Sequence, residues 1–185
     1  MVNKTESNVL HNCNFYVKCT LDYIQKNFIS EWKSDLMDDR VRKTHGNRLR
    51  CYRTFKLDFK MESYIMECSN FFNRKYIAMM RLSAHNLFIE TGRFSNPRIL
   101  PEQRICKHCN LCQVEDEMHF ILQCSKYNDI RRAFFNQVSD LLCSDFIDMT
   151  EEQKLIYLFC HNDKIVINKL GSYIGDCLHQ RSKCT

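Results

Sequence analysis

The sequence predicts a mostly α-helical protein without an extensive sheet. It has only 4 glycines and 2 prolines in 185 residues, about 3% together where an average protein has about 12%. β-Sandwiches and small barrels need many such turn-forming residues. Apolar residues instead recur at intervals of three and four, the spacing of one helical face. With 44% hydrophobic residues, the chain can also build a real core.

Helical spacing begins near the N-terminus. The first apolar stripe consists of Leu21, Ile24, Phe28, Trp32 and Leu36. A polar loop is expected over residues 35–45 because no such stripe continues there. Residues 49–59 fit a helix and partly also a strand, so both interpretations stay open. Residues 64–68 and 72–85 return to a helical pattern.

An extended connector is expected after a helix stop at Thr91 and Gly92, because both prolines, Pro97 and Pro101, follow closely. The connector and the composition divide the chain into three predicted segments. Residues 1–39 form an N-terminal helical extension or linker remnant, and residues 40–96 form a basic helical region. Residues 97–185 carry a cysteine cluster and the C-terminal helices.

Three further helices are predicted in the last segment. The first carries a well-spaced apolar stripe over residues 127–142. Thr150 and Gln153 have the spacing of a capping box and should begin the second. Asn162 is expected to cap the third, which continues to Cys177.

A cluster of cysteine and histidine residues has the spacing of a metal site. Four of the 12 cysteines, including Cys112, fall within 19 residues. The preferred ligand set is Cys106, Cys109, His119 and Cys124, because a Cys-x2-Cys turn aims two sulfurs at one ion and a second pair completes a tetrahedron. Such a Cys3His set is filled by protein, so we expect one structural zinc ion per chain. The full fold prediction is therefore one or more small irregular helical domains with a Cys3His zinc knuckle.

Two alternatives stay open for the ligands. Cys112 also stands at knuckle spacing from Cys109, and His108 could replace one thiolate. The chain between His119 and Cys124 sets a further condition, since five residues of α-helix rotate by about 140° past a full turn. We therefore expect the helix begun by the acidic residues 115–117 to end or bend before Cys124, with Ser125 capping a new one.

Positive charge is concentrated in residues 40–110, which hold 15 Lys/Arg against 5 Asp/Glu. Guanidinium groups suit phosphates, and interleaved aromatic residues can stack on bases. Packing of the aromatic residues in a core is an equally good interpretation. The candidate nucleic-acid-binding residues are Arg40, Arg42, Lys43, Arg48, Arg50, Arg53, Lys56, Arg93, Arg98, Arg104 and Lys107.

Several motifs, taken in order, resemble the C-terminal zinc-binding tail of non-LTR (LINE-type) retrotransposon reverse transcriptases. They are residues 81–94 (RLSAHNLFIETGRF), 104–110 (RICKHCN), 115–124 (EDEMHFILQC) and 127–131 (YNDIR). The resemblance covers roughly residues 45–180. It implies binding of the element's RNA or of the target DNA, and it implies no catalysis, because the chain has no room for the polymerase or endonuclease.

The sequence also bears on location and on an alternative function. Residues 1–19 contain no apolar run of a signal peptide, and no apolar run is long enough for a membrane span. We expect an intracellular protein with reduced thiols, nuclear or cytoplasmic and not secreted, with no membrane partner. The alternative function is a zinc-stabilised protein-interaction module, because residues 111–163 hold 10 Asp/Glu against 4 Lys/Arg and could face a basic partner.

Overall fold

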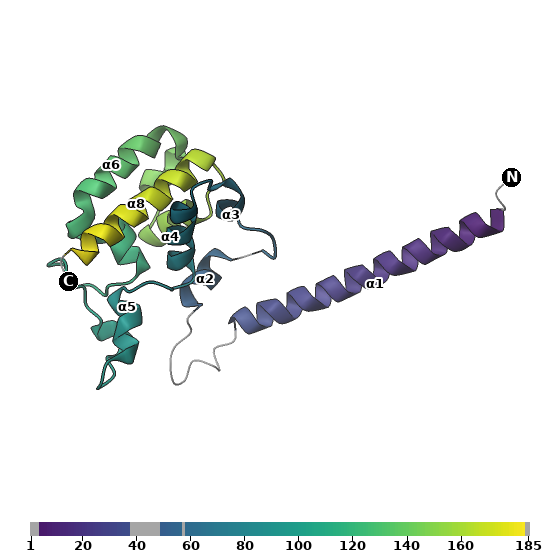
Figure 1. The fold of residues 1–185 in the computed structure, drawn as a ribbon, viewed down its shortest axis with the longest axis horizontal. Helices are drawn as coiled ribbons and strands as arrows, with labels where there is room; N and C mark the ends of the chain where they lie inside the picture. The colour runs from purple at the N-terminus through teal and green to yellow at the C-terminus, as the bar shows by residue number, and fades with distance from the viewer. Residues whose placement is uncertain (1–3, 38–48, 57, 184–185) are drawn as a thin grey trace. The chain divides into compact units, whose positions relative to one another are not determined.

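The structure is a computed structural model that describes residues 4–37, 49–56 and 58–183. The chain divides into two compact units, Met1–Lys43 and Thr44–Thr185, hereafter unit 1 and unit 2. Helices dominate both units (Figure 1). The only β pairing among the described residues is an isolated antiparallel bridge between Ile105 and Val114. The prediction of a mostly helical fold without an extensive sheet is confirmed.

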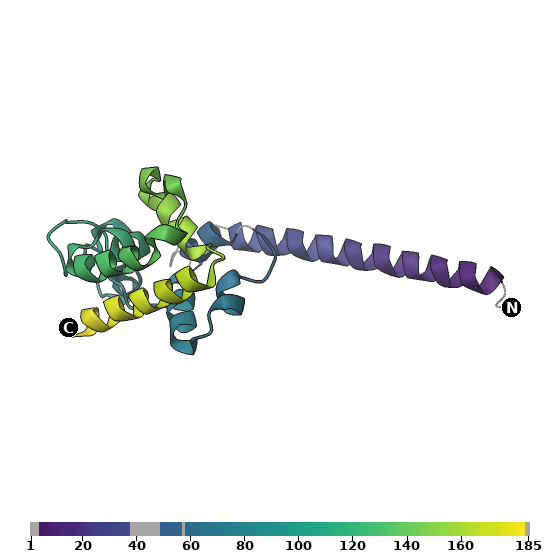
Figure 2. The ribbon, with the colours of Figure 1, turned by 90° about the horizontal axis from the view of Figure 1, so that it is seen from above.

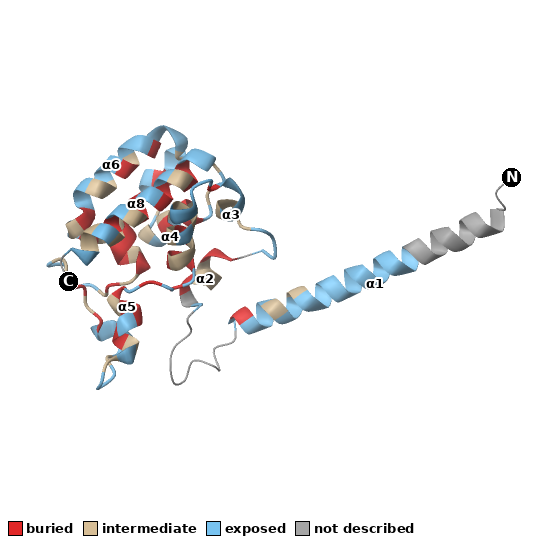
Figure 3. Ribbon diagram, in the orientation of Figure 1, coloured by how far each residue is buried: buried red, intermediate tan, exposed pale blue. Residues whose placement is uncertain are grey.

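Unit 1 is described as one helix, α1 (Lys4–Met37). It is longer than the predicted stripe and includes residues 35–37, where a loop was expected; the rest of that loop lies outside the described residues. Leu21, Ile24 and Phe28 are more than half exposed on α1. Figure 3 draws the part of α1 whose burial is described mostly in the pale blue of exposed residues. None of the helices described combines the length and apolar character that a membrane span requires.

Unit 2 begins with short helices and ends with its longest one. Before the connector come α2 (Arg50–Phe55), α3 (Ser63–Glu67), α4 (Phe71–Arg81) and α5 (Phe88–Thr91). After it come the π-helix η4 (His119–Gln123), α6 (Asn128–Val138), α7 (Glu151–Phe159) and α8 (Lys164–Ser182). Short 3-10 turns join them, among them η2 (Gly92–Phe94), η5 (Ser125–Tyr127), η6 (Ser139–Leu141) and η7 (Ser144–Asp148). Residues 50–55 are thus helical, and the strand interpretation of this stretch is wrong.

The core of unit 2 is built around α8, which packs against both α4 and α6 (Figures 1 and 2). Val166, Leu170 and Ile174 of α8 are at most 1% exposed. Gly171 allows α4 to approach closely, since a Cβ there would lie 2.8 Å from the backbone of Asn73. Only a residue without a side chain fits at this crossing.

The connector around residues 95–103 does not separate two bodies. Helix α4 precedes it and α8 follows it, yet the two helices pack together, and residues 44–185 form one unit. The predicted boundary between residues 40–96 and 97–185 is therefore corrected, because the shared core crosses it. The stop at Gly92 is real, since α5 ends at Thr91.

Two predicted caps can be compared with the structure. The capping box of α7 is confirmed, with the Thr150 hydroxyl accepting from the Gln153 N–H and the Gln153 side chain accepting from the Thr150 N–H. Helix α8 is capped by Asp163, whose carboxylate accepts from the N–H groups of Ile165 and Val166. The prediction of Asn162 as the cap is wrong by one residue. Asp is as good a cap as Asn, so composition alone does not separate them.

Candidate metal centre

A short hairpin presents the first two cysteines. Its sides are joined by the Ile105–Val114 bridge, and the Cys106 N–H donates to the Gln113 carbonyl at 2.8 Å. The loop between them turns back on Cys106, whose Sγ accepts from the His108 N–H at 3.4 Å. This N–H···S contact closes the turn and brings Cys109 round to the same side as Cys106, which is what the Cys-x2-Cys spacing requires.

The second pair of ligands lies on the π-helix η4 and at its end. In a π-helix each N–H donates to the carbonyl five residues back, and the Cys124 N–H donates to the His119 carbonyl at 2.7 Å. Residues five apart therefore stand one turn above the other, on the same side of the helix. An α-helix would point His119 and Cys124 in different directions, and the π-helix does not. The expected end of the helix before Cys124 is present, but widening of the helix rather than a bend aligns the two ligands.

The predicted fresh start at Ser125 is present only in part. A 3-10 turn begins there, but the Ser125 side chain caps nothing, and α6 follows after Tyr127. Asp116 caps the preceding turn, accepting from the His119 N–H at 2.8 Å. The prediction that acidic residues begin this helix is thus confirmed. The next helix follows a 3-10 turn and not a cap by Ser125.

The four preferred residues converge on one point. The ligand atoms of Cys106, Cys109, His119 and Cys124 all lie within 4.8 Å of one another. The Cys106 and Cys124 sulfurs are 3.9 Å apart, and the Cys109 sulfur is 3.3 Å from Nε2 of His119. Cys124 and His119 are nearly inaccessible to solvent. The chain therefore forms a Cys3His cluster, with three ligands buried and Cys109 partly exposed, that could hold one metal ion.

The other two candidates lie outside this cluster. Cys112 is exposed and has a φ of 52°, a left-handed conformation that serves the turn of the hairpin. Nε2 of His108 lies 3.7 Å from a carboxylate oxygen of Glu115. Among the residues described, the cluster contains neither of them, so the Cys106/Cys109 choice agrees with the geometry.

Neighbouring polar groups orient the cluster. Nδ1 of His119 lies 2.9 Å from the side-chain oxygen of Gln113. This contact leaves Nε2 directed at the sulfurs, the arrangement in which one ring nitrogen binds and the other is held by a partner. Arg131 of α6 donates to the carbonyls of Ile121 at 3.0 Å and Cys124 at 2.8 Å, at the end of the π-helix. Carbonyls at a helix end need partners from outside the helix, so Arg131 stabilises the turn that positions Cys124.

A largely buried ion pair, Glu115 with Arg181, fastens α8 to the hairpin. Glu115 accepts from Arg181 at 2.9 and 3.0 Å with both carboxylate oxygens. The same carboxylate accepts from the Phe88 N–H at 2.7 Å. Neither Glu115 nor Arg181 belongs to the predicted site. The sequence offers no signal for the pair, because the two residues are 66 positions apart and each is an ordinary charged residue.

Burial shifts Cys106, His119 and Cys124 toward their neutral forms. Desolvation raises the pKa of Cys124 to about 12 and also raises the pKa of Cys106. Desolvation lowers the pKa of His119. Without a nearby cation the buried thiols are therefore protonated and the imidazole is neutral. Deprotonation of the thiols needs a positive ion among them, which is the role that a metal fills.

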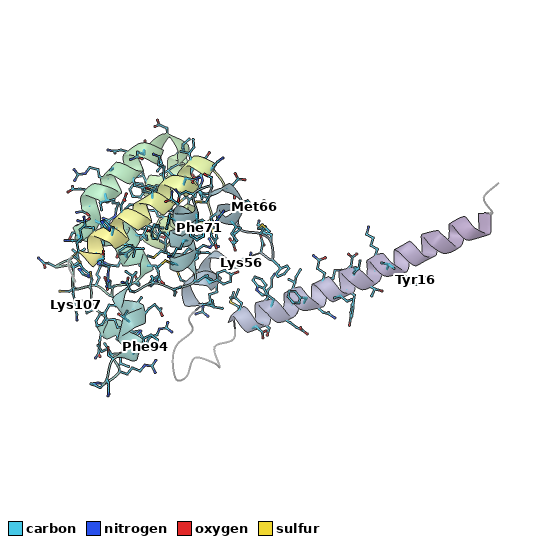
Figure 4. All side chains as sticks on the ribbon, in the orientation of Figure 1. Tyr16, Lys56, Met66, Phe71, Phe94 and Lys107 are labelled. Carbon is cyan, nitrogen blue, oxygen red and sulfur yellow. The ribbon has the colours of Figure 1, made fainter. Side chains whose placement is uncertain are left out.

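The candidate nucleic-acid-binding residues do not gather into one described surface. Arg40, Arg42, Lys43 and Arg48 lie outside the described residues, and the side chain of Arg50 is not described. Arg53 is half-buried on α2. The exposed members are Arg98 on the connector and Lys107 on the hairpin. Figure 4 shows Lys107 at the periphery of unit 2.

Three of the predicted phosphate contacts are corrected, because their charges are engaged inside the protein. Arg104 is 2% exposed, and its guanidinium donates to the carbonyls of Ile89 and Ile99. Lys56 is 8% exposed and pairs with Glu62 at 2.9 Å. The Arg93 side chain is nearly buried and pairs with Glu90. A phosphate cannot reach such groups without breaking these contacts.

Comparisons with protein-family models, with curated proteins and with solved structures find no match to this chain.

Proposed function

We propose that the Cys3His cluster binds one structural zinc ion and that the protein is a non-catalytic nucleic-acid-binding module. Its motifs resemble the C-terminal tail of non-LTR retrotransposon reverse transcriptases, and we propose the same ligands, retroelement RNA or target DNA. The observation that carries the zinc proposal is the convergence of four donor atoms within 4.8 Å.

The spacing of the donors suits zinc. A tetrahedral zinc with Zn–S bonds of about 2.3 Å and a Zn–N bond of about 2.0 Å separates two sulfurs by about 3.8 Å and a sulfur from a nitrogen by about 3.5 Å. The corresponding distances are 3.9 Å for Cys106 to Cys124 and 3.3 Å for Cys109 to His119. Three thiolates and one imidazole fill every position of such an ion, so zinc here would stabilise the fold and leave no position for a substrate.

Native mass spectrometry tests the metal. One zinc per chain is expected, and it should be lost in Cys106→Ser, Cys109→Ser, His119→Ala and Cys124→Ser. Cys112→Ser is the matched control, because Cys112 is exposed and outside the cluster. Loss of zinc from Cys112→Ser with retention in Cys106→Ser would overturn the ligand set, and a wild-type chain purified without zinc that also fails to take it up would overturn the site.

The nucleic-acid role is supported by the position of exposed cations beside this cluster. Lys107 is exposed between Cys106 and Cys109, and Arg98 is exposed on the connector that leads into the hairpin. Nζ of Lys107 lies 4.8 Å from the centre of the Phe88 ring. A metal in the cluster would hold the loop that presents Lys107. The net charge of +10 over residues 40–110 favours an anionic partner.

A gel-shift titration of RNA and DNA against salt tests this role. Lys107→Glu and Arg98→Glu should weaken binding and reduce its salt dependence, by about 0.9 in the logarithmic slope for each duplex phosphate that is no longer neutralised. Lys169→Glu on α8 is the control, because Lys169 is an exposed lysine on another element. Absence of binding to either nucleic acid at about 50 mM salt would overturn the role.

We also propose an intracellular location, in the nucleus or cytoplasm. The cluster requires three reduced thiolates, and the cell interior keeps thiols reduced. Fractionation of cells expressing the tagged chain measures the location, and its recovery from the medium would contradict the proposal.

A further inference from the structure

A pocket of about 460 Å³ opens beside the π-helix in unit 2. Its apolar lining comes from Leu122 of the π-helix, Phe135 of α6, and Leu142, Phe146 and Ile147 of the segment that joins α6 to α7. The volume lies in the range of about 300–1,000 Å³ that is usual for ligand-binding pockets. The site is separate from the cluster and from the cationic residues discussed above.

The walls of the pocket are held in place from behind. The ring of Phe146 lies 5.7 Å from that of Phe135 and 5.5 Å from that of Tyr157, centre to centre. The Tyr157 hydroxyl accepts from the Cys143 N–H at 3.0 Å. Phe146 is 7% exposed. These contacts fix the 3-10 turn η7, so the pocket is formed before any ligand arrives, which lowers the entropic cost of binding.

The segment that forms one side of the pocket is acidic. Residues 139–152 hold five Asp/Glu and no Lys or Arg. Asp145 and Asp148 are exposed on η7, which also supplies Phe146 and Ile147 to the lining. The one lysine of the lining, Lys154, pairs with Glu151 at 3.4 Å. The charges of the lining therefore balance, and the excess negative charge beside the apolar walls comes from Asp145 and Asp148 on η7.

We propose that the pocket docks a basic amphipathic helical segment of a partner protein. An apolar side chain of that segment enters between Phe135 and Ile147, and its Lys or Arg residues face the carboxylates of Asp145 and Asp148. Recognition of this kind places apolar anchors at helical spacing in a groove. Ile147 stands at the rim and is 81% exposed, so contact with an anchor would remove a large apolar surface from water. The carboxylates of η7 repel nucleic acid, so this pocket and the exposed cations Arg98 and Lys107 select different partners.

Fluorescence anisotropy with three labelled helical peptides tests the inference. The first peptide carries leucines at i, i+4 and i+7 with lysines at the flanking positions. The second has glutamates in place of the lysines, and the third has serines in place of the leucines. The first should bind unit 2 of the full chain, and the other two should bind at least about tenfold more weakly.

Variants of the exposed rim locate the binding. Ile147→Ser and the double variant Asp145→Lys/Asp148→Lys should each lower the affinity for the first peptide by about tenfold. The matched controls are Ile165→Ser and Asp129→Lys, which alter an exposed isoleucine on α8 and an exposed aspartate on α6. Neither control should change binding.

The inference is overturned by any of three results. They are equal binding of the lysine and glutamate peptides, equal loss in the control variants, or no binding of the first peptide by a chain that circular dichroism shows to be folded. Methyl chemical shifts give a second measurement, because the peptide should move the signals of Leu122 and Leu142 in the lining. Failure of RNA or DNA binding leaves this result unaffected, since the cationic residues lie elsewhere.

Discussion

Replacing Glu115 by glutamine tests how α8 is fastened to the cysteine hairpin. Glu115 is 2% exposed and faces the guanidinium of Arg181 at 2.9 and 3.0 Å. Removing one partner of a buried pair costs about 3–5 kcal/mol, because the other charge is left uncompensated. Glutamine keeps an oxygen that can accept from the Phe88 N–H, so we expect the lower end, about 3 kcal/mol. For a unit of this size that corresponds to a fall in melting temperature of about 10 °C.

The assay is thermal unfolding followed by circular dichroism, with equal zinc in every sample. Glu115→Gln is compared with Arg181→Met and with the double variant, and Glu152→Gln is the exposed control. The double variant removes both charges, so it should lose at least about 1.5 kcal/mol less than the sum of the single variants. A loss below about 1 kcal/mol in Glu115→Gln, or simple additivity in the double variant, would refute the assignment of α8 anchoring to this pair.

Three further changes report on packing and protonation in unit 2. Gly171→Ala should lower the free energy of unfolding by about 2 kcal/mol in urea, because its Cβ would meet the Asn73 backbone at 2.8 Å and this overpacking outweighs the better helix propensity of alanine; an unchanged midpoint contradicts the close crossing. Arg104→Met should cost about 3 kcal/mol, since it leaves two carbonyls without their donors, and a wild-type melting curve would contradict this. Burial lowers the pKa of His161, so its contribution to stability is present above the unfolded value of about 6.5 and is lost as pH falls through the lower folded value. Unfolding measured from pH 7 to 5 should therefore show a smaller loss in His161→Asn than in wild type, and parallel curves would refute it.

Local spacing predicted much of the fold and the choice of ligands. Helical stripes marked α4, α6, α7 and α8 because amphipathic spacing is written in neighbouring residues. The set Cys106, Cys109, His119 and Cys124 followed from Cys-x2-Cys and His-x4-Cys spacings for the same reason. Even the need to leave α-helical geometry before Cys124 was predictable, since rotation per residue is fixed.

What the sequence could not predict depends on distant contacts. Arg104 has the composition of a surface residue, and its burial depends on carbonyls that the connector and α5 bring to it. The joining of the two halves of unit 2 depends on the crossing of α4 and α8, whose contacting residues are 95 positions apart in sequence. The widened turn of the π-helix needed Arg131 to hold its carbonyls, a partner that no local pattern indicates.

The number of residues between His119 and Cys124 determines which type of helix can bring these two ligands together. His119 and Cys124 are five positions apart, so their side chains align only in a π-turn, which holds one residue more than an α-turn. A chain with one residue fewer would place its two donors four apart, about 40° past a full α-turn, and could keep both by exchanging the wide turn for an ordinary one. A chain with one residue more has no regular helix available. Evolution of this segment should therefore tolerate a single deletion better than a single insertion, and the His–Cys spacing in a related sequence would by itself indicate which helix is present.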